Sequence, residues 1–199
     1  PYVHYSCFYC LCQHLIVSIF GKQVDFPPLY TFIQQYGGAI FVVLSGCCAT
    51  LGSRSFRRGC IVFACGLLIS LVTFGMYRLG MATRDVIVWF GVLHLNAAAV
   101  LLTCLVHPLL QRVPAGMGLA TSAALFALTN QLPQGFIGFE GLRLCALPAG
   151  LYRANLFWLG LPDLTRFASA DYFPLLPWVF LFWCGLFLAR LWRPRAGQA

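Results

Sequence analysis

The sequence predicts an all-α fold, a polytopic membrane bundle of about six transmembrane helices. Two observations lead to this prediction: of 199 residues, 60% are hydrophobic and only 9% are charged, and the few charges divide the chain into six uncharged runs. A soluble domain has about 25% charged residues, so this chain lacks the charge to cover its own surface in water. Lipid solvates apolar side chains directly, and a single transmembrane domain over 1–199 is the simplest organisation.

The six uncharged runs have lengths that suit a bilayer. A helix needs about 20 residues to cross the hydrocarbon, at ~1.5 Å per residue. Strands are excluded because an open sheet edge leaves backbone groups unpaired in lipid. Five runs are long enough, and three tryptophans can anchor the shorter sixth run at the membrane interfaces. The runs are 1–21, 26–53, 59–77, 87–106, 113–139 and 172–189, and the tryptophans are Trp178, Trp183 and Trp192.

The distribution of charge orients the predicted bundle. If the loop between the second and third runs is cytoplasmic, its side holds seven basic residues and no acid, whereas the other side holds six basic residues and all five acids. The purely basic loop 53–59 and the basic tail follow the positive-inside rule, so we expect both termini in the cytoplasm. The connection 131–171 is long for a structureless loop. We expect it to be extracytoplasmic, as an interfacial helix or a re-entrant piece.

Composition also excludes several classes of function. The net charge is +8, but no basic run is interleaved with exposed aromatics as in a nucleic-acid binder. Most of the ten cysteines lie in apolar runs, where cysteine acts as a small hydrophobe. The lone C-x-x-C of Cys7 and Cys10 lacks a second ligand pair, so we expect no metal. No cleavable signal is apparent, and the chain begins within an apolar stretch. We therefore expect that its natural N-terminus is missing or altered.

Histidines inside the predicted spans are candidates for catalysis, because ionisable groups are costly in a membrane. His4 lies in the first run and His94 in the fourth. Gly91 shares a helical face with His94, so a ligand or a neighbouring helix can approach the imidazole closely. Imidazole takes and gives a proton near neutral pH. The alternative role for both is a hydrogen bond across the bundle, and we expect His14 and His107 to be interfacial.

Two motifs around the second loop are candidates for cofactor binding. Ser45 and Gly46 end the segment FVVLSG, where they would line a cavity or only permit close helix packing. Arg54, Arg57 and Arg58 follow within a short stretch. Their guanidinium groups are suited to bidentate hydrogen bonds with phosphate, and a positive-inside signal is the alternative explanation.

Asp171 opens the segment DYFPLLPW, in which Pro174 and Pro177 lie three residues apart. Proline is tolerated in the first turn of a helix. Aspartate is a favoured N-cap that the helix dipole stabilises. Asp171 is therefore a candidate catalytic carboxylate, with N-capping of the last helix as the alternative.

Six segments, in this order, resemble the bacterial relatives of heparan-alpha-glucosaminide N-acetyltransferase, within the transmembrane acyltransferase superfamily. DYFPLLPW and FGVLH are fairly specific, whereas LSG alone is weak. The family pattern also has an Arg-Gly segment before the early histidine and an aspartate soon after it, and residues 5–8 here contain no carboxylate. The segments, which cover nearly the whole chain, are Val3-His4, FVVLSG (41–46), the loop SR…RRG (53–59), WFGVLH (89–94), FWLG (157–160) and DYFPLLPW (171–178).

The resemblance implies a membrane-embedded acyltransferase of the bacterial cytoplasmic (inner) membrane. An acyl group, expected to be acetyl, would move from cytoplasmic acyl-CoA to a hydroxyl or amino group of an extracytoplasmic glycan or lipid. His4 would act as general base or carry the acyl group, and the three arginines would hold the CoA phosphates. A homo-oligomer fits this function. Two alternatives stay open: a non-enzymatic polytopic subunit or transporter-like protein, and haem or quinone binding through His4 and His94.

Overall fold

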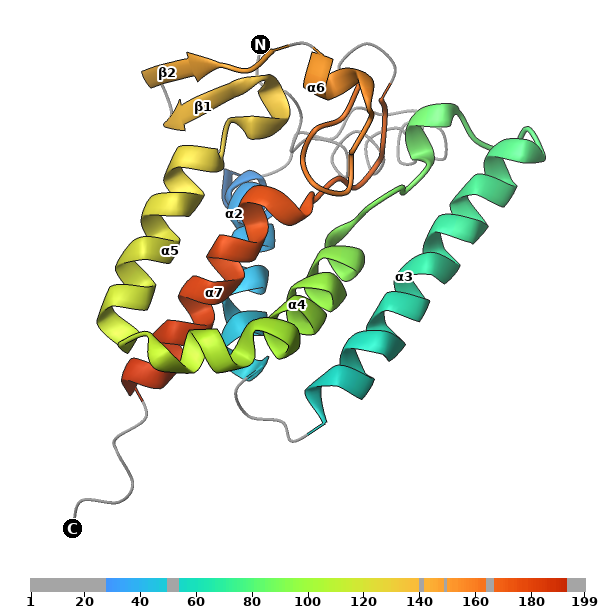
Figure 1. Ribbon diagram of the computed structural model, residues 1–199. Coiled ribbons are helices and arrows are strands. Elements are labelled where there is room, and N and C mark those ends of the chain that lie inside the picture. Colours follow the sequence, from blue (N-terminus) through green and yellow to red (C-terminus); the bar gives the residue numbers. More distant parts are fainter. Residues whose placement is uncertain (1–27, 50–53, 140–141, 149, 164–166, 193–199) are drawn as a thin grey trace.

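The computed structural model describes residues 28–49, 54–139, 142–148, 150–163 and 167–192, and the first predicted span lies outside them. The described residues form five long helices that run back and forth between two ends of a bundle (Figure 1). The helices are α2 (Pro28–Ala49), α3 (Ser55–Arg78), α4 (Val92–Arg112), α5 (Ala115–Thr129), α6 (Gly150–Arg153) and α7 (Leu175–Trp192); η1 (Arg84–Val86) and η2 (Leu132–Gln134) are 3₁₀ turns, and β1 (Phe136–Phe139) and β2 (Leu142–Ala146) are strands.

The predicted all-α membrane bundle is confirmed, and the protein is an integral membrane protein. Among the described helices, α3, α4 and α7 are long and apolar enough to cross a bilayer by length and composition. The 15 residues of α5 extend only about 22 Å at ~1.5 Å per residue, short of the ~30 Å hydrocarbon thickness. Three of the about six predicted spans are therefore supported by described helices.

The ends of α4 differ from the predicted run 87–106. The helix begins five residues later, at Val92, and ends at Arg112. Residues 87–91 are uncharged, but their backbone is extended and pairs with another segment instead of forming a helix. Pro108 lies inside the helix, where it removes one backbone donor, and Figure 1 shows that α4 bends along its length. Absence of charge marks an apolar run and does not fix where a helix starts.

The connection 131–171 contains a β-hairpin that the sequence analysis did not anticipate. β1 and β2 pair antiparallel, with an irregularity between Ile137 and Gly138. Apolar and β-prone residues flank a Glu-Gly pair, which is a typical composition for a hairpin. The guanidinium of Arg143 lies 4.3 Å from the ring centroid of Phe136. Among the described residues of this connection, α6 is an α-helix of four residues, and the expected interfacial or re-entrant position stays a prediction.

Helix α7 is the central helix, in contact with α2, α4 and α5. It approaches α2 closely, where Gly46 faces the carbonyl of Phe182 and Gly185 faces the carbonyl of Val43. The Cys47 thiol donates to the Gly185 carbonyl at 3.1 Å. Close backbone approach through small residues is how helices associate in lipid. Gly46 therefore has the packing role that the sequence left open.

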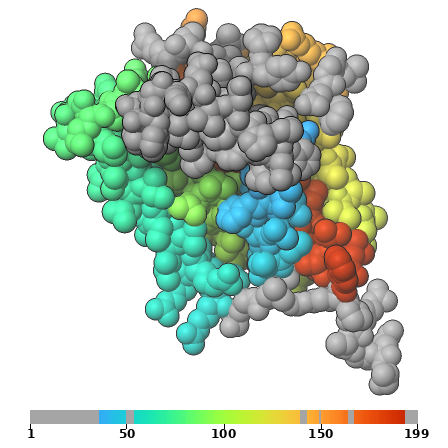
Figure 2. Space-filling view, turned by 180° about the vertical axis from the view of Figure 1, so that it is seen from behind, coloured from blue at the N-terminus to red at the C-terminus, as the bar shows by residue number. Residues whose placement is uncertain are grey.

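Helix α3 stands at the side of the bundle and contacts α4. Its two buried residues are Gly59 and Gly66, which lie on one face two turns apart. Gly59 packs against Leu101, and Gly66 packs against the ring of His94. Figure 2, seen from behind, shows α4 between α3 and α2.

The described charges lie at the two ends of the bundle. The arginine end holds the start of α3, with Arg54, Arg57 and Arg58, and the last residues of α4 and α7. The hairpin end holds β1, β2 and α6, together with the described acids Asp85, Asp163 and Asp171. This separation agrees with the two sides assigned from the sequence, whereas the cytoplasmic location of the arginine end stays a prediction.

The glycine contact between α2 and α7 predicts a specific loss of stability. Gly46→Ala or Gly185→Ala places a methyl group against a backbone carbonyl of the other helix, so the helices must move apart, at a cost of about 1–3 kcal/mol or more. Gly75→Ala is the matched control, because nothing lies within 4 Å of a Cβ there and alanine favours helix. Thermal unfolding in detergent should show lower midpoints for the first two variants and no decrease for Gly75→Ala. Equal midpoints for all three would contradict this packing.

Candidate functional site

Two sequence motifs that are far apart in the chain meet at the hairpin end. The segment before α4 carries WFGVLH, and the segment before α7 carries DYFPLLPW. The amide of Ala170 donates to the Ile87 carbonyl at 3.1 Å, and the amide of Phe173 donates to the Phe90 carbonyl at 3.0 Å. The two segments therefore lie side by side as a short parallel pairing and fix where α4 and α7 begin.

Asp171 accepts a hydrogen bond from the Val92 amide through Oδ2, at 2.9 Å. Val92 is the first residue of α4, so the carboxylate sits at the positive end of that helix dipole. Gly91 permits this approach, because a Cβ there would overlap the carboxylate. The alternative role that the sequence offered, N-cap of the last helix, is wrong in its partner: Asp171 caps α4, and α7 starts only at Leu175.

The motif FWLG joins the same assembly. The amides of Leu175 and Leu176 donate to the carbonyls of Trp158 and Leu159, at 2.8 and 3.1 Å. Gly160 has φ +113°, and a Cβ there would also overlap the Leu176 carbonyl, so only glycine fits. We call this assembly the motif junction; it comprises residues 87–92, 157–160 and 169–176.

Burial changes the acid–base properties of the motif junction. It raises the pKa of the Asp171 carboxyl above its ordinary value, although the Val92 amide opposes this shift. It also raises the pKa of the Tyr172 hydroxyl, which donates to the Phe157 carbonyl at 2.8 Å. Tyr172 is therefore a fixed neutral donor that ties FWLG to DYFPLLPW.

His94 is buried, with 3% of its surface exposed. Its Nε2 lies 3.5 Å from the Ser70 hydroxyl, which donates to the Val88 carbonyl at 2.6 Å. The rings of Phe63 and Phe90 flank the imidazole. His94 thus faces α3 and lies two residues after the Asp171-capped start of α4.

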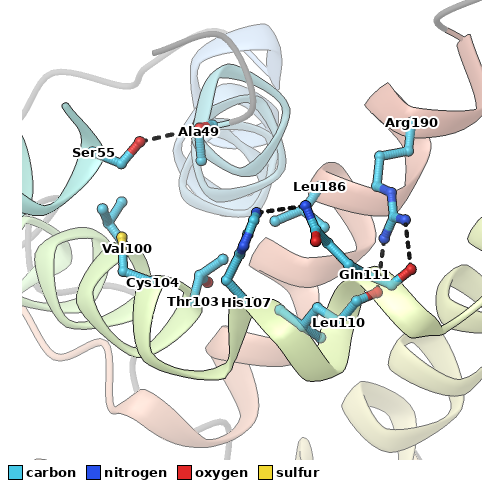
Figure 3. A pocket seen from close by; sticks show the side chains of 10 residues that line it. All are labelled: Ala49, Ser55, Val100, Thr103, Cys104, His107, Leu110, Gln111, Leu186 and Arg190. Carbon is cyan, nitrogen blue, oxygen red and sulfur yellow. Dashed lines mark hydrogen bonds between the residues drawn. The ribbon is translucent and has the colours of Figure 1, made fainter. Parts of the chain in front are cut away.

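A pocket with a volume of about 290 Å³ lies at the arginine end. Figure 3 shows its walls: α4 contributes most of the lining, and the end of α2, the start of α3 and the last turns of α7 complete it. The lining residues are Ala49, Ser55, Val100, Thr103, Cys104, His107, Leu110, Gln111, Leu186 and Arg190.

Polar groups at the pocket are held by the end of α4. The Arg190 guanidinium donates to the carbonyls of Leu110 and Gln111, at 2.8 and 3.3 Å. These carbonyls belong to the last turn of α4, where backbone acceptors need partners from outside the regular helix; the Leu110 carbonyl also accepts from the Val113 amide at 3.3 Å. Nε2 of His107 lies 3.3 Å from the Gln111 side-chain nitrogen. A cation, an imidazole and an amide thus meet beside one cavity (Figure 3).

The candidate cofactor residues lie near this pocket. Arg54, Arg57 and Arg58 are exposed and flank Ser55, which lines the pocket. The first turn of α3 contains no acidic residue, so the positive end of the helix dipole adds to the three cations. Ser45 is half-buried on α2, one turn before the pocket-lining Ala49.

The catalytic family described as heparan-alpha-glucosaminide N-acetyltransferase matches residues 7–199. The chain belongs to this family. It is therefore a membrane protein of an acetyltransferase family, as the motifs predicted. No curated protein and no solved structure matches the chain.

In this acetyltransferase family member, the predicted site residues fall into two groups at opposite ends. His94 and Asp171 lie at the hairpin end, whereas Ser45 and the three arginines lie toward the arginine end. His4 lies outside the described residues and three positions before the family match. The described residues contain no group of three or more histidine, cysteine or acidic side chains that could hold a metal.

Sequence reasoning missed the pocket residues His107, Gln111 and Arg190. His107 was expected only to be interfacial. A signal was present: the α4 residues of the pocket follow one another at intervals of three and four, as residues on one helical face do. That face carries a threonine, a histidine and a glutamine on a predominantly apolar helix.

The capping of α4 by Asp171 predicts how substitutions affect stability. Asp171→Ala removes the acceptor for the Val92 amide and should lower the free energy of unfolding by about 0.5–2 kcal/mol. Asp171→Asn keeps a side-chain oxygen at the same position and should lose less, since asparagine also caps well. Unfolding in detergent at neutral pH measures both, and equal losses for the two variants would contradict the capping role.

The pH dependence of the same variants has a defined sign. Because burial raises the pKa of Asp171 in the folded state, folding favours its protonated form. Its contribution to stability is largest below the unfolded pKa and declines as pH rises through the folded pKa. Wild type should therefore lose stability relative to the always-neutral Asp171→Asn as pH rises. A difference that is independent of pH would contradict this.

Proposed function

We propose that this chain transfers an acyl group, in the simplest case acetyl, from acyl-CoA to a hydroxyl or amino group of a glycan or lipid. The donor binds at the arginine end, from the cytoplasm, and the acceptor arrives at the hairpin end. The membrane is the bacterial cytoplasmic membrane. The proposal combines membership of an acetyltransferase family with the separation of polar groups between two ends of the bundle.

The pocket at the arginine end is the observation on which this proposal depends. Half of its ten lining residues carry a polar or charged side chain, and the others are aliphatic residues and one cysteine; apolar walls with placed polar groups are typical of ligand sites. Its lining includes the cation Arg190, and the exposed Arg57 and Arg58 lie two and three residues after the lining residue Ser55. An elongated anionic molecule with a long neutral arm, such as acyl-CoA, matches this arrangement.

The start of α3 favours an anion for a physical reason. Helix N-termini attract negative charge, because their free amides and the helix dipole point outward. Here Arg54, Arg57 and Arg58 add three positive charges to that end, with no acid in the first turn. Their mutual repulsion is relieved when phosphates bind, and guanidinium groups bind phosphate through paired hydrogen bonds.

The transfer step needs a base between the two ends. A base takes the proton of the acceptor O–H or N–H, the acceptor attacks the thioester carbonyl, and the carbon–sulfur bond breaks as the thiolate takes up a proton. We assign the base, or a transient acyl carrier, to His4. His94 and Asp171 stay candidates, and their contacts favour positioning roles: Asp171 fixes the start of α4, and His94 packs against α3.

Neutralising two arginines tests the donor site. Arg57→Gln with Arg58→Gln removes charge-assisted hydrogen bonds to phosphate, each worth about 1.5–3 kcal/mol, and should weaken CoA binding by at least about tenfold. Isothermal titration of the detergent-purified protein with CoA measures this. The control is Arg78→Gln with Arg84→Gln, which removes the same charge from two exposed residues at the hairpin end.

The outcomes separate the candidate functions. Weaker CoA binding only in the Arg57 and Arg58 variant supports the donor site. Equal weakening in both variants would indicate a general charge effect and contradict it. A wild-type protein that binds no CoA would favour a non-enzymatic or transporter-like subunit.

A further inference from the structure

Asn96 lies within α4 and is buried, with 7% of its surface exposed. Its side-chain amide donates to the Val92 carbonyl at 2.9 Å. Its Oδ1 has no hydrogen-bond partner, and among the described residues it is the one buried side-chain nitrogen or oxygen in this state. An unpaired acceptor in a membrane span is unfavourable, and such a group in a native structure needs an explanation.

The helical position of Asn96 connects it to the pocket. At ~100° per residue, it projects within roughly 25° of the mean direction of the α4 residues that line the pocket. It lies one turn, about 6 Å, beyond Val100, the pocket residue closest to the middle of the bundle. His94, by contrast, projects roughly 160° away from the direction of Asn96, toward α3. Asn96 therefore continues the pocket face inward.

The facing helix shows a parallel arrangement. α2 contacts α4, and its pocket residue Ala49 is preceded by Ser45 one helical turn further inward. Ser45 and Asn96 thus occupy corresponding positions, each one turn inside the pocket on its own helix. Inward of the residues that line the pocket, each helix thus carries a polar residue near the pocket face, in a region where apolar residues are otherwise the rule.

We propose that Oδ1 of Asn96 accepts a hydrogen bond from an amide N–H of the acyl-CoA arm. This inference rests on the proposed function. The arm that joins the nucleotide of CoA to its thiol carries two amide groups, each with one N–H donor. A molecule that binds its phosphates at the arginines and extends past Val100 brings an N–H to the depth of Asn96. The unpaired acceptor then favours acyl donors whose arm contains amide groups.

A matched pair of substitutions tests the proposal. Asn96→Val removes the acceptor. Asn96→Thr introduces a side chain with nearly the same shape as valine but with a hydroxyl oxygen that can accept a hydrogen bond. Thr103 on the same helix shows that a threonine can fill this role: its hydroxyl donates to the Ala99 carbonyl at 2.6 Å and accepts from the Trp183 indole at 2.9 Å. Two probes are titrated into each purified protein: CoA, and adenosine 3′,5′-bisphosphate, the nucleotide part that lacks the arm.

We expect Asn96→Val to bind CoA about tenfold more weakly than wild type and Asn96→Thr within about threefold of it. All three proteins should bind the bisphosphate equally, and Asn96→Val should unfold no earlier than wild type, because it removes an unpaired buried acceptor. Equal CoA affinity for the valine and threonine variants would overturn the inference. This is the result expected if a buried water, and not the ligand, satisfies Asn96. Failure of wild type to bind either probe would refute the proposed function itself.

Discussion

The hydrogen bond from the Val92 amide to the Asp171 carboxylate ties together the hairpin end of the molecule. A helix that starts inside a membrane protein exposes several unpaired amides, and no water is available in lipid to satisfy them. The chain meets this need with a carboxylate from a segment 79 residues away, which can approach because residue 91 is glycine. The same contact aligns the segments that precede α4 and α7. The positions of the helices, and hence of His94 and the pocket face of α4, follow from it.

The packing of the other helices is also set by the lipid that surrounds them. Lipid is as apolar as leucine, so burial of apolar side chains gives little drive for helices to associate, and close packing must provide it. Gly46 and Gly185 bring the backbones of α2 and α7 into contact, and Gly59 and Gly66 bring α3 against α4. Many large apolar side chains of α3, such as Leu67, Leu68 and Leu71, remain exposed, as a lipid-facing helix requires.

The sequence was sufficient for what depends on local composition and insufficient for what depends on tertiary contacts. Uncharged runs located α3 and α7 within a few residues, and the arginine loop indicated one end of the bundle. The same runs misplaced the start of α4, because residues 87–91 are extended through pairing with a distant segment. For Asp171 the sequence left capping of the next helix in the chain open as the alternative to catalysis, whereas the helix that it caps is α4. The sequence did not point to Asn96, because an uncharged amide in a span becomes informative only when its burial and lack of a partner are known.

The central claim is that the chain places its donor chemistry and its acceptor chemistry on opposite sides of a membrane. The most direct measurement is the accessibility of single cysteines at positions 57 and 153 to a membrane-impermeant maleimide in intact cells and in inverted vesicles, in a variant whose native cysteines are replaced by alanine. Both positions are exposed, one at the start of α3 and one in α6. The account predicts labelling of position 153 only from outside and of position 57 only from the cytoplasmic side. Labelling of both positions from the same side would contradict it.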